Sequence, residues 1–485
     1  MDNGRLRGFT STAFISLCLV PACFGSAFSI TELGARATGM GTAFIATADD
    51  PSALFYNPAG IAFQPGTHFE MDNAVVVGLF RFTPATAPPG QVVPPNGYSE
   101  SIRPHFLPLA FLYATKQLSP RMTFGFGVFT PFGLAANSTN FNDGDPNLTK
   151  FVSRFAGTRV RLESYWFQPT LAYRLTDNLS VAVGPTFVHT HLELEESFLN
   201  PLGYDDGLKF GRTAAPVILP GVPVDLAASI ISRLLPEGRS RIAGTANGFA
   251  ISGGLLWKNA LPKTDIGLLY RSSVVNHLSG KASFAFGDKP YALEQYVGPS
   301  FLPNAFPNQA ITGSFPTPAT YGIGFANSAI RNLRISADVR MQDYKKFRNL
   351  PLDFPINENS TTLTNIALPA EKILNFNFRE SWNFAVGAEK KLNELMTIRM
   401  GYMFDMSPVP SQSVGPLFPD SDRHSFTLGA SRKSGNKEFT FFYEAMKFVD
   451  RQTNVAANDY QWTNGDYHNF AHVAGLALRF DMKEH

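Results

Sequence analysis

Cysteine is almost absent from this sequence. Its 485 residues include two cysteines, Cys18 and Cys23, and both lie close to the amino terminus. If that end is removed by processing, the rest of the chain has no thiol. Disulfide bonds, thiolate catalysis and cysteine-ligated metal are then excluded from the mature protein.

Charge and long apolar runs are scarce as well. Charged residues are 16% of the chain, against roughly 25% in soluble domains. The net charge of +2 gives no signal for nucleic-acid binding. Beyond residue 27 no apolar run approaches the ~18 residues of a membrane-spanning helix. Aromatic residues are plentiful, with 44 Phe. Such a chain can bury its apolar surface in a membrane as a β-barrel, whose strands need only alternate.

The amino terminus resembles a secretory signal peptide. Two arginines precede an apolar run over residues 9–24, and the small residues 25–27, Gly-Ser-Ala, offer a cleavage site. We therefore predict that residues 1–27 are a signal peptide and that the mature chain begins near Phe28.

Two other interpretations of this end are weaker. A membrane anchor would need ~20 apolar residues, and this run is shorter. Lipidation at Cys23 is suggested by residues 20–23, which loosely resemble a lipobox, but Pro21 fits that motif poorly.

Several segments alternate strictly between polar and apolar residues. In residues 334–342 every even position is polar and every odd position is apolar, and residues 382–389 and 396–405 repeat the pattern. Alternation of this kind predicts β-strands with one polar and one apolar face. A half-buried sheet of a soluble protein has the same pattern, but strands of about 10 or more residues in sustained succession favour a transmembrane barrel.

Short turns and long connections also alternate along the chain. Short turns are expected at residues 118–121, 176–178, 391–394 and 433–437. Long connections are expected at residues 82–102, 133–155, 197–245, 288–311, 346–378, 407–423 and 449–466. Predicted strands start near residues 67, 103, 122, 158, 179, 246, 263, 312, 331, 379, 395, 424, 437 and 467. The fold class is therefore all-β, a transmembrane antiparallel β-barrel of about 14 strands over residues 67–480, with both chain ends on its short-turn, periplasmic side.

The last predicted strand closes on an aromatic residue. Phe470, Leu476 and Phe480 share one of its faces. A terminal amphipathic strand of this kind looks like the signal read by the outer-membrane assembly machinery. Residues 481–485 follow it as a short tail, which departs from the usual pattern.

Residues 28–66 precede the first predicted strand and do not resemble one. Pro51 and Pro58 interrupt ladder pairing, and Gly34 and Gly41 permit tight backbone paths. The segment holds too many apolar side chains for a solvated tail. We expect it to fold inside the lumen, because a barrel of this width leaks unless it is filled.

The stretch GARATGMGTAFIATADDPSALFYNPAGIAF, residues 34–63, resembles the N-terminal hatch of the FadL/TodX family. Members of that family are outer-membrane transporters of long-chain fatty acids and aromatic hydrocarbons. Further similarities, in the order of the family, are FTPFGLAAN (129–137), TPATYGIGFA (317–326), ADVRMQDYKKF (337–347) and GYMFDMSPVPSQSVGPLFPDSDRHSFTLGAS (401–431).

The resemblance implies a monomeric 14-stranded barrel plugged by its N-terminal hatch, and passive uptake of a hydrophobic small molecule. Substrate in this family passes from an extracellular apolar groove to an interior site. It leaves sideways into the bilayer where the third strand kinks, next to the hatch motif. The implied hatch and gating residues are Asn57, Pro58, Ala59 and Gly60, and the implied kink residues are Pro131, Phe132 and Gly133. An ordinary strand end is the alternative interpretation of Gly133.

The sequence leaves the substrate open. Family sites for fatty acids use inward basic residues, and the candidates here are Lys345, Lys346 and Arg348, although surface-loop cations are an equal interpretation. Without an interior cation, a neutral alkane or aromatic is favoured. The apolar part of loop 197–245 either binds a hydrophobic ligand or packs on itself; its candidate residues are Ile218, Leu219, Leu234 and Leu235.

Enzymatic interpretations are weaker. A barrel-type outer-membrane lipid hydrolase needs a Ser or Asp nucleophile beside a His. Residues 420–424, Asp-Ser-Asp-Arg-His, contain Ser and His but match the family's loop-to-strand junction. His189 and His191 share a strand face without an apparent third metal ligand. We expect no catalytic residue, cofactor or metal, and a hatch argues against a general porin. The expected partners are the substrate, outer-membrane lipid and, during biogenesis, the assembly machinery of a Gram-negative outer membrane.

Overall fold

The computed structural model describes most of the chain beyond the predicted signal peptide. The described residues are 27–85, 99–102, 107–137, 152–199, 206–287, 291–354, 371–415, 419–453 and 463–482. Residues 1–26 of the predicted signal peptide and residues 483–485 of the predicted tail lie outside them.

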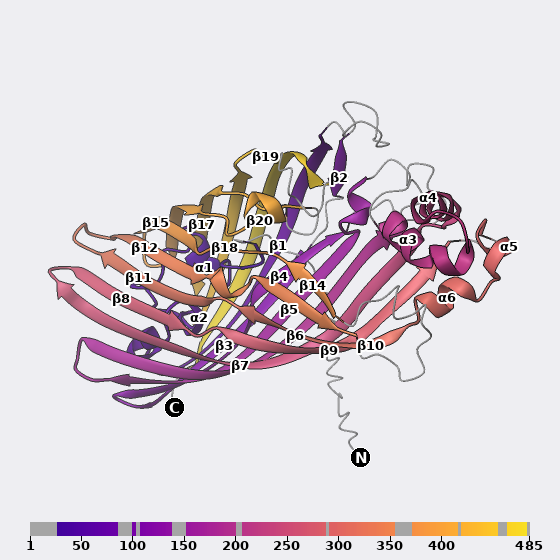
Figure 1. Ribbon diagram of the computed structural model, residues 1–485. Helices are drawn as coiled ribbons and strands as arrows, with labels where there is room; N and C mark the ends of the chain where they lie inside the picture. Colours follow the sequence, from indigo (N-terminus) through magenta and orange to yellow (C-terminus); the bar gives the residue numbers. More distant parts are fainter. Residues whose placement is uncertain are drawn as a thin grey trace, which may run out of the picture.

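Strands dominate the described residues (Figure 1). They are β1 (Thr67–Pro84), β2 (Glu100–Ile102), β3 (Leu107–Ser119), β4 (Met122–Asn137), β5 (Arg159–Arg174), β6 (Leu179–Phe198), β7 (Gly238–Leu261), β8 (Thr264–Arg271), β9 (Val274–Phe286), β10 (Gln309–Thr317), β11 (Ala319–Asn327), β12 (Leu333–Asp343), β13 (Asn349–Asp353), β14 (Glu371–Asn375), β15 (Ser381–Lys391), β16 (Met396–Asp405), β17 (Arg423–Ser434), β18 (Lys437–Phe448), β19 (Arg451–Thr453) and β20 (Gly465–Met482).

Helices are short and lie between strands or before the first one. They are α1 (Ala35–Thr38), α2 (Ala53–Tyr56), η1 (Pro58–Phe63), η3 (Val152–Phe155), α3 (Asp206–Ile218), α4 (Val224–Leu234), α5 (Glu294–Val297), α6 (Phe301–Ala305), η4 (Tyr344–Lys346) and η5 (Ser411–Ser413). Within the described residues, no helix is long and apolar enough to cross a membrane.

The strands form one closed antiparallel barrel. Neighbours along the chain pair in turn, and the last strand, β20, pairs with the first, with Thr67 opposite Met482. Several labelled strands are consecutive parts of one longer strand. The two parts pair either with the same neighbouring strand or with two parts of one neighbouring strand. These are β2 with β3, β8 with β9, β10 with β11, β12 with β13, β14 with β15 and β18 with β19. Counted in this way, the described strands form the 14-stranded barrel that the sequence predicts.

The two ends of the barrel differ. Tight turns connect β3 to β4, β5 to β6, β7 to β8, β15 to β16 and β17 to β18 at one end, which we call the turn end, and the chain also leaves β20 there. The opposite, loop end carries helices α3 to α6 (Figure 1). The predicted short turns are therefore confirmed. Strand β20 continues for two residues beyond Phe480, to Met482.

Two predicted strand starts are wrong. The strand expected near residue 379 begins with β14 at Glu371, inside the predicted loop 346–378. The strand expected from residue 246 begins at Gly238, inside the predicted loop 197–245. The outward side chains of this extension include Arg239 and Arg241 rather than apolar residues, so the apolar–polar alternation that marks the other strands is missing here. The remainder of the loop contains two helices, α3 and α4.

The strands are apolar outside and polar inside. On β15, the outward Phe384 and Val386 are 44% and 50% exposed, whereas the inward Asn383 is buried. On the neighbouring β12, Asp338 and Arg340 are buried. A soluble sheet would show the opposite arrangement. An apolar outer surface around a polar lumen is the pattern of a barrel surrounded by lipid.

The N-terminal segment, residues 27–66, lies within the ring of strands (Figure 1). Nearly every residue from Ala27 to Gln64 is buried. Helix α1 contacts β1, β17, β18 and β20, and η1 contacts β4, β5, β6 and β7 on the other side. The segment therefore contacts the wall on both sides of the lumen.

Candidate functional site

Inward polar side chains of the barrel hold the irregular backbone of the N-terminal segment. The Asp338 carboxylate on β12 accepts hydrogen bonds from the N–H groups of Phe44 and Ile45, at 2.7 and 2.8 Å. Two strands away, beyond β11, the Arg271 guanidinium on β8 donates to the Phe55 carbonyl at 2.7 Å. Buried backbone groups outside regular structure need such partners. The polar lumen thus supports the segment at many points.

Ion pairs fix the segment near the turn end. Arg36 contacts both Asp49 of the same segment, at 2.5 Å, and Glu389 on β15, at 2.8 Å. Arg334 on β12 contacts the second Asp49 oxygen at 2.8 Å. Burial alone would raise the pKa of Asp49, but attraction to Arg36 and Arg334 outweighs it and holds that pKa well below its usual range. Asp49 therefore stays charged, and the contact persists in mild acid.

The predicted hatch residues Asn57–Gly60 lie against β6 and β7. The Asn57 amide donates to the carbonyls of Ile45 and Leu255, at 2.8 and 3.0 Å, and its oxygen accepts from the N–H of Ala59. Gly254, on β7, makes this approach possible, because a Cβ there would overlap the Asn57 side chain. Asn57 therefore ties two parts of the segment to the wall.

The predicted kink in the third strand of the barrel is a β-bulge in β4. Phe129 is opposite Trp166 of β5, but Phe132 is opposite Ser164, so three steps along β4 match two along β5. Pro131 lies in the bulge, where its missing N–H costs no ladder bond. The structure therefore places Pro131, Phe132 and Gly133 at a local irregularity of the wall.

Residues 28–30 of the N-terminal segment pair with this bulge. The Ile30 N–H donates to the Pro131 carbonyl, and the Gly133 N–H donates to the Phe28 carbonyl, both at 2.8 Å. Ser29 is directly opposite Phe132 in an isolated β-bridge. The part of the N-terminal segment that is hydrogen-bonded to Pro131 and Gly133 is thus residues 28–30. The predicted hatch residue Asn57 is instead hydrogen-bonded to β7 of the wall.

The ladder between β3 and β4 is interrupted on the same side. Leu112 opposite Val128 is the last pair between these strands among the described residues. Strand β3 nevertheless begins at Leu107, and β4 continues to Asn137. Residues 28–30 therefore supply hydrogen-bond partners to β4 where β3 does not.

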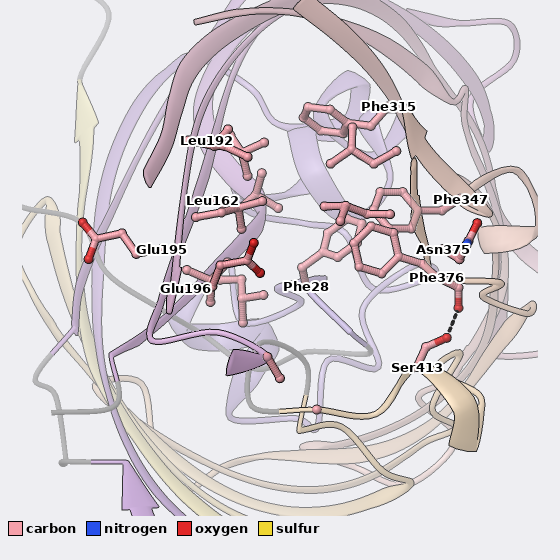
Figure 2. Close-up of a pocket in the computed structure, with 18 of the residues that line it drawn as sticks. Phe28, Leu162, Leu192, Glu195, Glu196, Phe315, Phe347, Asn375, Phe376 and Ser413 are labelled. Atoms are coloured by element: carbon pink, nitrogen blue, oxygen red, sulfur yellow. Dashed lines mark hydrogen bonds between the residues drawn. The ribbon is translucent and has the colours of Figure 1, made fainter. Parts of the chain in front are cut away.

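An apolar cavity lies beside the bulge, towards the loop end. Together with its mouth it encloses about 1040 Å³. Figure 2 shows Leu162 and Leu192 on one side of it and Phe315 and Phe347 on the other, with Phe28 between them. The cavity has the apolar lining of a site for a small hydrophobic ligand.

Phe28 belongs to both the cavity and the bulge. Its ring lines the cavity and packs at 5.1 Å from the ring of Phe347 and at 5.4 Å from that of Tyr344, between centroids. On its other side it lies 5.8 Å from the ring of Phe132, which in turn packs on Trp166. A continuous aromatic cluster thus runs from the cavity to the interrupted wall.

The predicted carboxylate-binding residues lie outside this cavity. Lys345, Lys346 and Arg348 are exposed, and none of them lines it. The Lys345 ammonium is 2.9 Å from the carboxylate of Glu380, which raises the pKa of that lysine.

The predicted groove residues of the loop end pack against other loop residues. Leu235 is buried, and Ile218, Leu219 and Leu234 are partly buried against an apolar cluster that includes Phe198, Phe210 and Phe306. The exposed large apolar residues of α3 and α4 are others: Val217, Val224, Leu226 and Ile230. They form the outward face of the two-helix loop.

The residues of the enzymatic interpretations do not assemble. His424 accepts or donates a hydrogen bond at 2.7 Å to the Tyr402 hydroxyl, while the Ser421 hydroxyl is buried without a partner in the described structure. His189 is bonded to Asn247. In the described part of the chain, no three His, Cys, Asp or Glu side chains are grouped to hold a metal.

Sequence reasoning missed the role of residues 28–30. Phe28 was assigned as the expected start of the mature chain, and nothing in its neighbourhood predicts a pairing with β4. The alternation of apolar and polar residues from Phe28 to Thr31 is the only local signal.

A closed barrel with an apolar exterior, a folded internal segment and an apolar cavity that reaches an interrupted wall defines a transport barrel of the outer membrane. The chain belongs to the family described as outer membrane protein transport protein (OMPP1/FadL/TodX), which matches residues 16–482. This match confirms the family resemblance of the sequence.

Similar proteins include transporters of two substrate classes. The long-chain fatty acid transport protein of Escherichia coli K12 is 24% identical over 410 residues, covering 83% of this chain and 82% of that protein. The crystal structure of a Pseudomonas aeruginosa FadL homologue has a TM-score of 0.73 and 16% identity, covering 94% of this chain and all of the other. That of the Ralstonia pickettii toluene transporter TbuX has a TM-score of 0.62 and 20% identity, with the same coverage. The structures establish the common fold.

Proposed function

We propose that this protein carries hydrophobic small molecules passively across the outer membrane and releases them sideways into the bilayer. The substrate enters from the loop end, occupies the apolar cavity, and leaves where β3 and β4 lose their pairing. The N-terminal segment acts as the hatch, with Asn57–Gly60 as its anchor on the wall and residues 28–30 as its moving part.

The observation that carries this proposal is the double position of Phe28. Its ring lines the cavity, and its carbonyl is bonded to Gly133 at the bulge. A ligand in the cavity that displaces Phe28 also removes the hydrogen-bond partner of β4. Binding of a ligand in the cavity is thereby coupled through Phe28 to opening of the wall at the β4 bulge. The ligand would shift the protein between two populated conformations.

The proposed route keeps the substrate out of water. Each CH₂ group gains about 0.8 kcal/mol from burial, so an aqueous pore offers a hydrophobic molecule no advantage. A dry cavity followed by a lateral exit into lipid does. The sequence carries no nucleotide-binding motif, and we therefore propose movement down a concentration gradient.

The first contact would be made at the loop end. The exposed apolar residues Val217, Leu226 and Ile230 of α3 and α4 offer a surface for a hydrophobic molecule that arrives from outside. Since one closed barrel contains every part of the proposed route, we propose that the protein works as a monomer, inserted by the outer-membrane assembly machinery.

A reversible disulfide bond between residues 29 and 132 tests the lateral route. In the isolated bridge, Ser29 and Phe132 are directly opposite, a geometry within reach of a disulfide. The predicted mature chain has no cysteine of its own. The double variant Ser29→Cys/Phe132→Cys would be produced in Gram-negative cells that lack their own hydrophobic-compound transporter. Uptake of labelled oleate and labelled toluene would be followed before and after reduction.

The oxidised double variant should lose most of the uptake, and reduction should restore it. Each single variant, treated in the same way, controls for the loss of the Phe132 ring. If the oxidised protein transports as fast as the reduced one, the lateral route is wrong. Uptake by cells that carry the folded wild-type barrel is also compared with uptake by cells without it. If neither compound enters the first cells faster, the proposed transport function itself is wrong.

A further inference from the structure

We infer that the turn end of the barrel carries a binding surface for anionic phospholipids. The surface belongs to two neighbouring hairpins, β15–β16 and β17–β18, and its ligand is a lipid headgroup with a phosphate and a net negative charge. This inference goes beyond the proposed function, because it rests on the contact of the barrel with lipid and not on the route of the substrate.

Five cationic side chains gather at the turn end of these hairpins. Strands β15 to β18 are hydrogen-bonded neighbours in the wall (Figure 1). The cations lie at the ends of β15 and β17 and at the start of β18, and all five are exposed. We call them the basic patch: Lys390, Lys391, Arg432, Lys433 and Lys437.

Acidic side chains do not balance the basic patch. In the two hairpins, residues 381–405 and 423–448, Glu394 is the one exposed acidic residue. The carboxylate of the buried Glu438 lies 2.7 Å from the Arg479 guanidinium on β20, whereas the Lys433 ammonium is 3.9 Å away. The patch therefore presents an excess of positive charge to its surroundings.

Three cations of the patch lie on the outer face of the wall. They are Lys390, Arg432 and Lys437, and alternation along a strand returns each fourth residue to the same face. The residues four positions away from them are apolar and about half exposed on the lipid-facing surface: Val386, Leu428 and Phe441. These three cations therefore continue the lipid-facing surface at its turn-end edge.

The register brings the outward cations close together. Arg432 is directly opposite Phe439, which is two residues from Lys437 on the same face, so the Cα atoms of the two cations are about 7 Å apart. Lys390 lies across β16, with its Cα about 12 Å from that of Arg432. The Lys437 Nζ is 5.4 Å from the centroid of the Phe480 ring. A phosphate between Arg432 and Lys437 can accept hydrogen bonds from both.

Exposed apolar side chains lie between these cations and favour a lipid as the partner. Ile398 is directly opposite Lys390, and Phe439 is opposite Arg432; the two apolar residues are 42% and 51% exposed. An acidic protein surface would bring charges against these apolar groups. A phospholipid instead offers its phosphate to the cations and its acyl chains to the apolar side chains.

The test measures which lipid lies beside the basic patch of the mature barrel, reconstituted in vesicles. The predicted mature chain has no cysteine, so Ile398→Cys can carry a single bimane label at the patch. Val183→Cys carries the same label at an exposed position of β6. The turn next to β6, residues 175–178, has no Lys or Arg, so this position is the matched control.

The vesicles contain equal amounts of dioleoylphosphatidylglycerol, which is anionic, and dioleoylphosphatidylethanolamine, which is zwitterionic. One of the two lipids is brominated in its acyl chains and quenches the label when it is adjacent. The ratio of quenching by the two brominated lipids gives the local enrichment. Both leaflets have the same composition, so the direction in which the barrel inserts does not affect the ratio.

We expect phosphatidylglycerol to be enriched about tenfold at position 398 and not at position 183. The enrichment should fall close to one in the triple variant Lys390→Gln/Arg432→Gln/Lys437→Gln. A variant with the same loss of charge at exposed residues of the loop end, Arg212→Gln/Lys281→Gln/Lys447→Gln, should keep the wild-type value. Sodium chloride at 1 M should also abolish the enrichment in wild type, which tests the inference even if the first triple variant does not fold.

Two results would overturn the inference. Equal ratios at positions 398 and 183 would show that the patch does not select anionic lipid, and an acidic protein surface would then be its remaining partner. A ratio at position 398 that survives both the loss of the three cations and 1 M salt would show that the enrichment has another cause. Neither result bears on the proposed function, which the uptake of oleate and toluene tests separately.

Discussion

The carbonyl of Phe28 accepts a hydrogen bond of 2.8 Å from the N–H of Gly133, across the lumen side of the β4 bulge. Phe28 precedes the barrel in sequence, and Gly133 lies in its third strand. A Cβ on Gly133 would press on the Ile30 side chain, so glycine permits this close pairing. The contact makes the start of the N-terminal segment a neighbour of β4 where, among the described residues, β3 does not pair with β4.

Removing the Phe28 ring should loosen this contact. Phe28→Ala takes away packing against Phe132, Tyr344 and Phe347. Large-to-small changes of this kind cost about 3 kcal/mol or more, which corresponds to roughly hundredfold faster local opening. Hydrogen exchange of residues 28–33, measured by mass spectrometry, checks the effect. Phe441→Ala, a change of an exposed ring on β18, should leave that exchange as it is.

Two adjacent glycines of β7 should differ sharply in their tolerance of alanine. A Cβ on Gly254 would overlap Asn57 and Pro58, whereas one on Gly253 has nothing closer than the Ala182 carbonyl, at 3.7 Å. Gly254→Ala should push Asn57 off the wall at a cost of about 1–3 kcal/mol. The displaced segment should let ions pass, which conductance in a planar bilayer would detect. Equal conductance of the two variants would contradict the proposed anchor.

Breaking the Arg36 ion pairs should free the turn-end part of the segment. Arg36→Met removes the contacts with Asp49 and Glu389. Arg399 and Arg334 still neutralise those carboxylates, so we expect a loss of about 2–3 kcal/mol rather than the full cost of an unpaired buried charge. Hydrogen exchange of residues 34–50 would report it. Lys345→Met, at an exposed ion pair, serves as the control.

The same contact should be insensitive to mild acid. The pKa of Asp49 is lowered in the folded protein, so its stabilisation is present above the ordinary aspartate pKa and is lost only as the pH falls through the lowered value. In wild type, exchange of Ala48 and Asp49, corrected for the intrinsic pH dependence, should not change between pH 8 and pH 5. A marked loosening by pH 5 would show that Asp49 does not stabilise the segment in this way.

The barrel itself was predictable because its signals are local. Strict alternation in residues 334–342 and a short turn at residues 391–394 each specify their own strands without reference to the rest of the chain. The signal fails where a strand leaves the apolar layer. At the start of β7, Arg239 and Arg241 take outward positions, whereas further along the same strand such positions hold apolar residues such as Phe249. The first part of β7 therefore has the sequence pattern of a loop.

The site was less predictable because its contacts are distant in sequence. Pro131 and Gly133 indicate an irregular strand, but no local sequence pattern predicts that they pair with the segment around Phe28. The cavity likewise joins Leu162, Leu192 and Phe347 from three separate strand or loop segments. The predictions of the strand kink and of the hatch residues Asn57–Gly60 came from the family resemblance.

The orientation of the strands gives the last prediction, on Val386 and Asp338. Val386 is central in β15 and 50% exposed, while Asp338 on the neighbouring β12 is buried. In a soluble protein, a charge at Val386 would be harmless. On a lipid-facing surface, Val386→Arg should reduce the unfolding free energy in lipid vesicles by about 2–4 kcal/mol, and Val386→Leu should not. Asp338→Leu instead removes the acceptor of the Phe44 and Ile45 N–H groups, so it should accelerate hydrogen exchange of those residues far more than it destabilises the barrel. A harmless Val386→Arg would mean that this face of β15 does not contact lipid.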